Sequence, residues 1–387
     1  MNATKLYIDK PMINQYKKYI SKDYLNNKKL STIEIKNGFI LPAKKRFMQR
    51  EPLCGNGGVL DCDLNYVEQS AQLGYNMSDR LNGKYNFNKD TVKYIDETVV
   101  YLNHYINHWG HFLIDVIGRL WYRKDNTKYV LTTDLNSEME LKGSFLDFIE
   151  LSGLKKEDII IINQPTKFKK IIIPENSIYP GKYYTKEYIN TFKTVIKNCK
   201  IKKTNEPKIY LSRQLLNANK ETGEKRIEDF FINNGFKPIH MEKLSLQEQI
   251  SYIYNAKEIA CMSGTLPHNI LFSKENTKII ILNKTYALNM HQFLINQASK
   301  CNCIFIDTHK SILPVLYGLG PFIIKETDQL KKYSEDNNYK YSFNLINKKW
   351  RIENIKYILK YLKINRLRIA KDKFVNKKEL YNYYKKK

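Results

Sequence analysis

The chain has 387 residues, of which 42% are hydrophobic, so it is too long for one ordinary core and predicts two domains. The formal net charge of +26, from 65 basic and 39 acidic residues, favours an anionic partner such as nucleic acid, acidic lipid or a phosphorylated substrate, although a lysine-rich solvated surface explains it equally well. The sequence contains no run of about 18 apolar residues and no apolar leader at its start, so we expect neither a transmembrane span nor a signal peptide.

The cysteine pattern points to a reducing environment. The six cysteines form no CxxC pair, and Cys301 and Cys303 are closer in sequence than the cysteines of a usual zinc knuckle. Cys261 lies in an apolar run and is expected to be buried. We therefore expect a cytoplasmic protein without structural disulfides and without a metal site.

The first half begins with a segment that is difficult to interpret, in which the glycines of residues 55–58 indicate a loop or hairpin. From about Glu97 onward, apolar β-rich runs alternate with longer segments of helical periodicity. The predicted strands are 97–102, 128–133, 158–163 and 169–175, and the predicted helices are 108–122, 144–154 and 185–206.

The second half alternates more regularly. Strands are predicted at 207–212, 236–241, 258–263, 277–283 and 303–308, and helices at 224–235, 244–256, 266–273 and 287–300. Five strands that alternate with four helices predict a parallel, doubly wound α/β sheet.

The C-terminal segment differs in composition, because residues 348–387 contain 15 basic and 3 acidic residues. Within it, Ile352, Ile355, Leu359 and Leu362 recur at helical spacing, which predicts an amphipathic helix followed by a basic tail. This helix either packs on the domains with a solvated basic face or attaches to an anionic membrane surface. The predicted units are an N-terminal α/β domain at 1–205, a Rossmann-like domain at 206–325 and a basic helical extension at 326–387.

Two turns of the second half are expected at one edge of its sheet, where ligands of open parallel sheets bind. Ser212-Arg213 follows the first strand, and Ser263-Gly264-Thr265 follows the third and precedes a helix with Pro267 in its first turn. The amides of a helix start and an arginine both suit a pyrophosphate, and Gly264 lets the backbone approach it closely. The same residues also fit an ordinary strand-to-helix turn.

Three further polar residues lie near these turns in the sequence. Arg226, at the start of the next helix, is a second candidate for binding phosphates. His268 and Asn269 lie in the first turn of the helix after Gly264. They either face the crevice and bind the ligand, or Asn269 satisfies local backbone groups while His268 lies at the surface.

The first half contains a cluster of ionisable residues: His104, His108, His111, Asp115 and Arg119. Intervals of three and four place the histidines and the aspartate on one face of a helix, unless His104 belongs to the preceding strand or loop. The spacing permits metal ligands, but HExxH is absent. A general base that activates a hydroxyl, oriented or assisted by the aspartate, fits better. A polar helix start with Arg119 paired to Asp115 is the structural alternative.

Several motifs follow one another along the chain: INHWGHFLIDVIGRLWY, KIYLSR, a later arginine, GFKPIHMEKLSLQEQISYIYNAKEIACMSGTLPHNILF and KIIILN. In order and spacing they resemble glycosyltransferase family 61, over roughly residues 55–310, and bacterial capsular polysaccharide biosynthesis proteins look most similar. The resemblance implies a GT-B-like fold, in which two Rossmann-like domains enclose the active site in a cleft. It also implies inverting transfer from a nucleotide sugar, commonly a UDP-sugar, without a cofactor or a firm metal requirement.

The resemblance also implies roles for individual residues. The Ser-Arg element of the family corresponds to Ser212-Arg213, and its second arginine corresponds to Arg226, after the long loop 217–225. Its H-G-A-x-L-T-N element corresponds to residues 263–269, with Ser263 in place of the usual His and His268 in place of the usual Thr. The expected ligands of the nucleotide sugar are Arg213, Arg226, Ser263, Gly264, Thr265, His268 and Asn269.

The G-H-F segment of the family corresponds to residues 110–112. His111 is therefore the expected base, with Asp115 as its orienter or replacement, and His108 and Arg119 are expected in the cleft near the acceptor. The acceptor would be a glycan or glycolipid of surface polysaccharide synthesis. We expect the protein in the cytoplasm or at the inner face of the membrane.

Three other functions are compatible with parts of the sequence. The charge suits a nucleic-acid-binding protein, but the basic residues are spread along the chain and no nucleic-acid-binding motif occurs, so no nucleic acid partner is expected. Ser263 in place of His favours an inactive, membrane-associated scaffold of the same fold. A phosphosugar or alditol-phosphate transferase would use the same anion site with a different donor.

Overall fold

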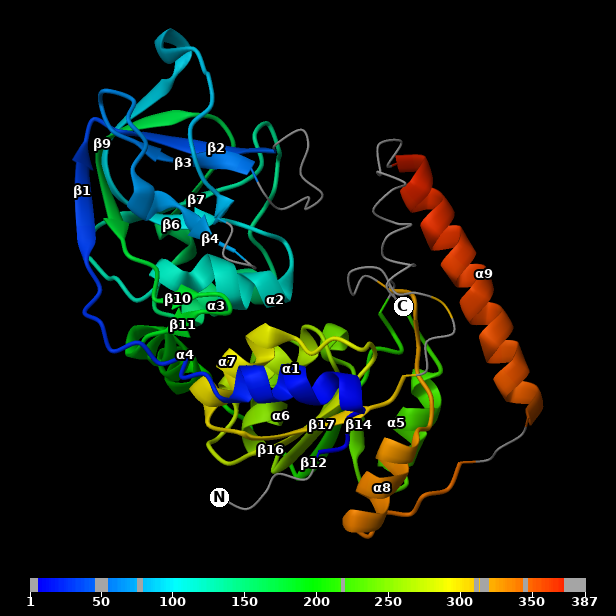
Figure 1. The fold of residues 1–387 in the computed structure, drawn as a ribbon. Coiled ribbons are helices and arrows are strands. Elements are labelled where there is room, and N and C mark those ends of the chain that lie inside the picture. The colour runs from blue at the N-terminus through cyan, green and yellow to red at the C-terminus, as the bar shows by residue number, and fades with distance from the viewer. Residues whose placement is uncertain are drawn as a thin grey trace.

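The computed structural model describes residues 6–45, 55–74, 79–216, 220–309, 313, 320–343 and 347–371 (Figure 1). The predictions for Cys54, for residues 217–219 of the long loop and for the basic tail after Lys371 lie outside these residues. The described chain is mixed α/β, as predicted, with one large sheet in each half.

The first-half sheet has nine strands, in the order β4-β5-β3-β2-β9-β6-β7-β8, with β1 paired to β9. Strands β9, β6, β7 and β8 are parallel and correspond to the predicted strands, whereas β1, β2 and β3 pair antiparallel. Only part of this sheet therefore has the parallel pairing of a Rossmann-like domain. The strands are β1 (Thr32–Lys36), β2 (Phe39–Lys45), β3 (Gly55–Leu60), β4 (Gln72–Leu73), β5 (Asp79–Leu81), β6 (Lys93–His104), β7 (Lys128–Thr132), β8 (Ile159–Ile162) and β9 (Thr166–Pro174).

The glycines at 55–58, expected in a loop or hairpin, lie within strand β3, which pairs antiparallel with the preceding strand β2 as the second strand of a hairpin. Gly58 has a φ of +115°, and a Cβ at this position would lie 2.7 Å from the Ser70 hydroxyl oxygen. The glycine is needed because a neighbouring turn packs directly onto the strand. The turn-like composition thus reflects a close approach within a sheet.

The second-half sheet has five parallel strands in the order β14-β12-β15-β16-β17, and it confirms the predicted doubly wound α/β arrangement of this half. Its central strands are buried, which explains their continuous apolar runs. The strands are β12 (Lys208–Leu211), β14 (Lys237–Ile239), β15 (Glu258–Met262), β16 (Lys278–Asn283) and β17 (Asn302–Asp307), and the helices between them are α5 (Glu224–Ile232), α6 (Leu246–Asn255), the 3₁₀ helix η8 (Leu266–Phe272) and α7 (Met290–Ser299).

The strand order of this sheet reverses beside β12. The chain passes from β12 to β14 on one side and then continues at β15 on the other. Helices on opposite faces leave a crevice at such a point, beyond the carboxyl ends of the two neighbouring strands. In the register of β12 and β15, Leu211 pairs with Cys261. Arg213 and Ser263 each come two residues later, so the two turns leave the sheet side by side, as predicted.

The two halves share one apolar core. The helices α3 (Ser144–Leu151) and α4 (Lys186–Asn198) face the second half (Figure 1). The Phe272 ring lies 6.2 Å from Phe148 and 5.5 Å from Phe192, measured between ring centroids. Because this cluster is continuous and buried, apolar packing holds the two halves together.

The first residues of the chain pack on the second half. Tyr7 bridges to Ile306 in parallel fashion, and the Asp9 amide donates a hydrogen bond to the Asp307 carboxylate at 2.7 Å. Helix α1 (Lys10–Ile20) contacts α7 in Figure 1. Although they begin the chain, these residues therefore pack on the sheet and helices of the second half.

Two helices follow that sheet. Helix α8 (Asp328–Asp336) packs against β17, and helix α9 (Asn347–Lys371) contacts the short strands β13 (Glu221–Thr222) and β18 (Phe322–Ile323). In Figure 1, α9 lies along the outside of the molecule. Within the described ranges, every helix is too short or too polar to cross a bilayer.

Candidate active site

The histidine cluster of the first half lies on a helical segment that changes its winding. Trp109–His111 is α-helical, Phe112–Val116 is a π-helix and Ile117–Arg119 is a 3₁₀ turn. The helix expected at 108–122 is therefore confirmed in position, but its geometry is irregular. A π segment is often found at functional sites because it reorients the side chains around it.

His111 and Asp115 form a hydrogen-bonded pair on this segment. The His111 Nδ1 atom lies 2.8 Å from the Asp115 Oδ2 atom. The Asp115 side chain is fully buried, whereas 27% of the His111 side chain is exposed. In the tautomer with its proton on Nδ1, the imidazole donates a hydrogen bond to the Asp115 carboxylate oxygen and keeps a lone pair on Nε2. This arrangement is the one that a general base requires.

His108 caps the same segment. Its Nδ1 atom accepts a hydrogen bond from the His111 amide at 3.4 Å, and the two rings lie 4.8 Å apart. Desolvation and the neighbouring His111 lower the pKa of His108 to about 4, with Arg213 of the second half adding to the effect. His108 is therefore neutral near pH 7.

His104 does not belong to this helix. It ends strand β6, as the alternative interpretation allowed, and its amide donates a hydrogen bond to the Gln72 side chain at 2.9 Å. Its Nε2 atom lies 3.6 Å from Asp134. The functional part of the cluster is therefore reduced to His108, His111 and Asp115.

The histidine segment rests directly on the glycine turn of the second half. The Trp109 indole N–H donates a hydrogen bond to the Asn269 side-chain oxygen at 2.8 Å. A Cβ at Gly110 would lie 2.9 Å from the Thr265 Oγ1 atom and 3.4 Å from the His268 ring. Glycine at 110 thus permits the close approach of two motifs that are about 160 residues apart in the chain.

His268 and Asn269 are buried, with 4% and 3% of their surface exposed. The His268 Nδ1 atom lies 2.9 Å from the Gln292 side-chain oxygen, and burial lowers the pKa of His268 to about 3. Asn269 also donates a hydrogen bond to the Leu266 carbonyl at 3.0 Å. The protein itself uses these polar atoms: Asn269 holds the turn against Trp109 of the first half, and His268 ties it to α7 of the second half.

The more accessible part of the turn is Ser263-Gly264-Thr265, whose residues are half-buried. Gly264 has a φ of +131°, a backbone conformation that favours glycine. The helix that follows is a 3₁₀ helix of seven residues, shorter and more tightly wound than an α-helix. We therefore attach more weight to the charged side chains beside this turn than to the dipole of its helix.

Two cations converge on one carboxylate beside the turn. The Arg213 Nε atom lies 3.2 Å and the Lys284 Nζ atom 2.7 Å from Oε1 of Glu221, whose side chain is fully buried. A Cβ at Gly264 would lie 3.5 Å from that Nζ atom. Only 17% of the Arg213 side chain and 12% of the Lys284 side chain are exposed. The cluster is thus a compact, partly desolvated cationic site, where charge interactions are stronger than in water.

Lys284 is not among the predicted site residues, although its place in the sequence indicates one. Lys284 directly follows β16, the strand next to β15. It therefore lies at the same edge of the second-half sheet as Arg213 and Ser263, beyond the carboxyl ends of the strands.

A second carboxyl group lies behind Arg213. Glu224 accepts hydrogen bonds from the Arg213 amide at 3.2 Å and from the Tyr210 hydroxyl at 3.1 Å. Burial, followed by the nearby Glu221, raises the pKa of Glu224 to about 7. Burial opposes ionisation of Glu221 as well, but Lys284 and Arg213 lower its pKa. Below pH 7 the two cations therefore outnumber the ionised carboxylates, and the net positive charge favours an anion.

Arg226, the second arginine expected to bind phosphate, is engaged elsewhere. Its Nε atom lies 2.8 Å from Glu326 and its Nη2 atom 2.8 Å from Glu353. The ion pair with Glu353 joins α5 to α9, and the ion pair with Glu326 joins α5 to the segment before α8. The structure thus does not bring Arg226 into the cluster formed by Arg213, Glu221 and Lys284.

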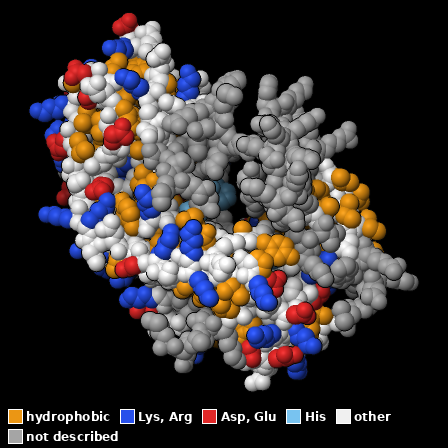
Figure 2. Space-filling view, in the orientation of Figure 1, with side chains coloured by type: hydrophobic (Ala, Val, Ile, Leu, Met, Phe, Trp, Pro, Cys, Tyr) orange, Lys and Arg blue, Asp and Glu red, His pale blue; other side chains and the backbone are white. Residues whose placement is uncertain are grey.

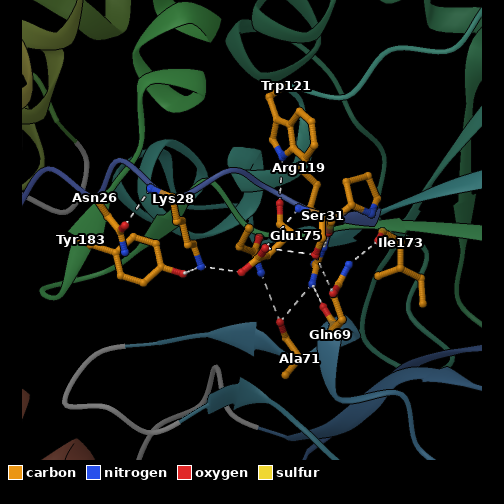
Figure 3. Close-up of polar contacts among 12 residues, drawn as sticks. Asn26, Lys28, Ser31, Gln69, Ala71, Arg119, Trp121, Ile173, Glu175 and Tyr183 are labelled. Atoms are coloured by element: carbon orange, nitrogen blue, oxygen red, sulfur yellow. Dashed lines mark hydrogen bonds and ion pairs between the residues drawn. The ribbon is translucent and has the colours of Figure 1, made fainter. Parts of the chain in front are cut away.

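Arg119, expected in the cleft, is fully buried inside the first half (Figure 3). Its guanidinium donates hydrogen bonds to the carbonyls of Pro174 at 2.7 Å and of Ala71 at 3.2 Å, and also contacts the carbonyl of Gln69. The prediction that Arg119 lies in the cleft near the acceptor is therefore wrong. The charge is buried because carbonyl oxygens that belong to several segments satisfy its donors.

Replacing Arg119 with methionine should lower the free energy of unfolding by about 3–5 kcal/mol, because it leaves several buried carbonyls without donors. Urea denaturation measures this change. The exposed Lys124, replaced in the same way, is the control and should change stability by less than about 0.5 kcal/mol. An R119M chain as stable as the wild type would show that this network does not stabilise the fold.

A family model covers the part of the chain that contains most of this site. Residues 109–280 match the family model described as Glycosyltransferase 61, and a comparison with curated proteins finds no match. The matched region begins at Trp109 and ends within β16, so it contains both the histidine segment and the glycine turn. Figure 2 shows a hollow between the halves with a histidine side chain at its floor. The match supports glycosyltransferase activity, with a sugar donor and an acceptor, for the part of the chain that forms this site.

Proposed function

We propose that the protein is an inverting glycosyltransferase that moves a sugar from a UDP-sugar donor to a glycan or glycolipid hydroxyl. The observation that carries this proposal is the contact between the two motifs. The Trp109–Asn269 hydrogen bond and the Gly110–Thr265 approach join the segment that holds a base to the turn beside a cationic cluster. Sugar transfer needs a base and a charged leaving-group site close together.

The cationic cluster suits the donor diphosphate. Arg213 can form paired hydrogen bonds to phosphate oxygens, and Lys284 adds a compact charge. Both cations are already positioned by Glu221, so little reorganisation is needed when the diphosphate binds. The hydroxyls of Ser263 and Thr265 and the amide of Gly264 are further donors. Two side-chain cations, partly balanced by Glu221, supply positive charge to the leaving diphosphate, so we propose transfer without a metal cofactor.

The base in this proposal is Nε2 of His111. It removes the proton of the acceptor hydroxyl while the hydroxyl oxygen attacks the anomeric carbon from the side opposite the diphosphate. The new glycosidic bond forms as the bond from the anomeric carbon to the phosphate oxygen breaks, and the nucleoside diphosphate leaves. This in-line displacement inverts the configuration of the sugar. Asp115 holds the imidazole and stabilises the imidazolium that forms, and neutral His108 lies beside it to contact the acceptor.

We place the reaction in surface polysaccharide synthesis of the capsular type, in the cytoplasm or at the inner face of the membrane. The proposed layout is GT-B-like, with the donor on the second half and the acceptor on the first. The separate sheets of the two halves and the position of the site at their contact support this layout. The basic composition of residues 348–387 supports the location at a membrane with anionic lipids.

A thermal-shift panel of nucleotide sugars, with and without a divalent metal, tests the proposal. A donor at about 100 times its Kd stabilises the folded chain by about 2.7 kcal/mol, and for a chain of this size the melting temperature should rise by a few degrees. We expect UDP-sugars to produce this shift in EDTA, and the same donor to support transfer. A panel in which no nucleotide sugar shifts the melting temperature at millimolar concentration would exclude the proposed donor site.

A further inference from the structure

Helix α9 has two different faces. Its inner face packs on the second half, where the Glu353 carboxylate pairs with Arg226 and the Tyr357 side chain is fully buried. Its outer face is apolar and exposed. Ile352, Ile355, Ile358, Leu359 and Leu362 are 52%, 57%, 38%, 62% and 58% exposed.

The exposed residues form one continuous stripe. With about 100° of rotation per residue, Ile352, Ile355, Leu359 and Leu362 fall on the side of the helix opposite Tyr357, and Ile358 lies at the edge of the stripe. Figure 2 shows hydrophobic side chains gathered on the outer side of the molecule, over α9. The sequence is compatible with packing of this helix on the domains, but in the structure its apolar stripe faces away from them. An apolar stripe of this size on the surface marks an interaction site.

The charge beside the stripe indicates the partner. Lys356 and Lys363 are exposed next to it, and residues 348–387 contain 15 basic and 3 acidic residues, a net charge of 15 − 3 = +12. A second copy of the chain would bring two such segments together, and their charges would repel. A bilayer with anionic headgroups offers an apolar interior and a negative surface at the same time.

We infer that α9 is a membrane-docking helix that lies in the plane of an anionic bilayer surface and inserts Ile352, Ile355, Leu359 and Leu362 among the lipids. The Arg226–Glu353 ion pair ties this helix to α5 of the second half. Docking therefore holds the half with the cationic cluster at the membrane surface. The inference goes beyond sugar transfer, and the binding it describes does not require the protein to be active.

Co-sedimentation of the full chain with vesicles tests the inference. We expect binding to vesicles of phosphatidylcholine with about 30% phosphatidylglycerol, weak binding to phosphatidylcholine alone, and a decrease when salt rises from about 0.1 to 0.5 M. The double variant I355E/L359E should bind the anionic vesicles at least about tenfold more weakly. The matched control is I20E, because Ile20 ends helix α1 and is 56% exposed, like Ile355. It should bind as the wild type does.

The inference is overturned if the wild type does not bind anionic vesicles, or if I355E/L359E binds them equally well. It is also overturned if the wild type binds no vesicles but is a dimer in light scattering and I355E/L359E is a monomer. Thermal melting of each variant shows whether it is folded. Sugar transfer to a soluble acceptor, measured without vesicles, should be unchanged in I355E/L359E. A chain without transferase activity that still binds vesicles would refute the proposed function and leave the docking helix in place.

Discussion

Replacing His111 with alanine is expected to lower kcat for sugar transfer by about 100- to 10,000-fold, the usual contribution of a positioned general base. The reason is the loss of the Nε2 atom that the Asp115 contact of 2.8 Å leaves available to accept a proton. Steady-state transfer assays across pH measure the effect. The part of the pH–rate profile that depends on the deprotonated base should disappear with the side chain.

Two variants make this result specific. Asp115→Asn keeps the size of the partner but loses its charge, so kcat should fall while donor binding stays near the wild-type value. His240→Ala is the control, because 29% of the His240 side chain is exposed, compared with 27% for His111. If H111A kept the wild-type pH–rate profile, another group would have to be the base.

Replacing Arg213 with alanine is expected to reduce kcat/KM by about 30- to 1,000-fold, or 2–4 kcal/mol of transition-state stabilisation. The charge of the leaving diphosphate grows as its bond to the sugar breaks, so a fixed guanidinium in a partly desolvated site acts most strongly in the transition state. The loss also leaves the buried Glu221 carboxylate with Lys284 as its remaining partner in the cluster. The variant should therefore show a weaker thermal shift with the nucleoside diphosphate.

Arg213→Lys retains the charge but not the paired hydrogen bonds, so its activity should lie between those of the wild type and R213A. Arg123→Ala is the control, since its guanidinium donates a hydrogen bond to the Ser152 carbonyl at 2.7 Å within the first half. If R213A had unchanged kcat/KM and unchanged nucleotide binding, the assignment of Arg213 to the diphosphate site would be wrong.

The second-half sheet was predictable because each of its strands is a short apolar run followed by a helical period. The neighbouring positions of the turns at 213 and 264 followed from that alternation together with the crevice rule for parallel sheets. The His111–Asp115 pair could be predicted because residues four apart face each other on a helix. The two side chains remain in contact although the segment between them is a π-helix.

Other features depend on contacts that no local pattern encodes. Arg119 has the spacing of a cleft residue, but carbonyls from distant segments surround it. Likewise, Arg226 pairs with Glu326 and Glu353 of the C-terminal region, which the motif spacing does not reveal. The packing of the first residues on β17 is a long-range pairing between the two ends of the chain. Tertiary contacts of this kind override local patterns.

A crystal structure of the chain with an intact, unreactive UDP-sugar analogue tests the central claim most directly. We expect the diphosphate to contact Arg213 and Lys284, the backbone near Gly264 to approach it, and the anomeric carbon to face the His111 Nε2 atom across the space for an acceptor hydroxyl. A donor bound away from the contact between the two halves, or with its anomeric carbon turned from His111, would contradict a single site built from both.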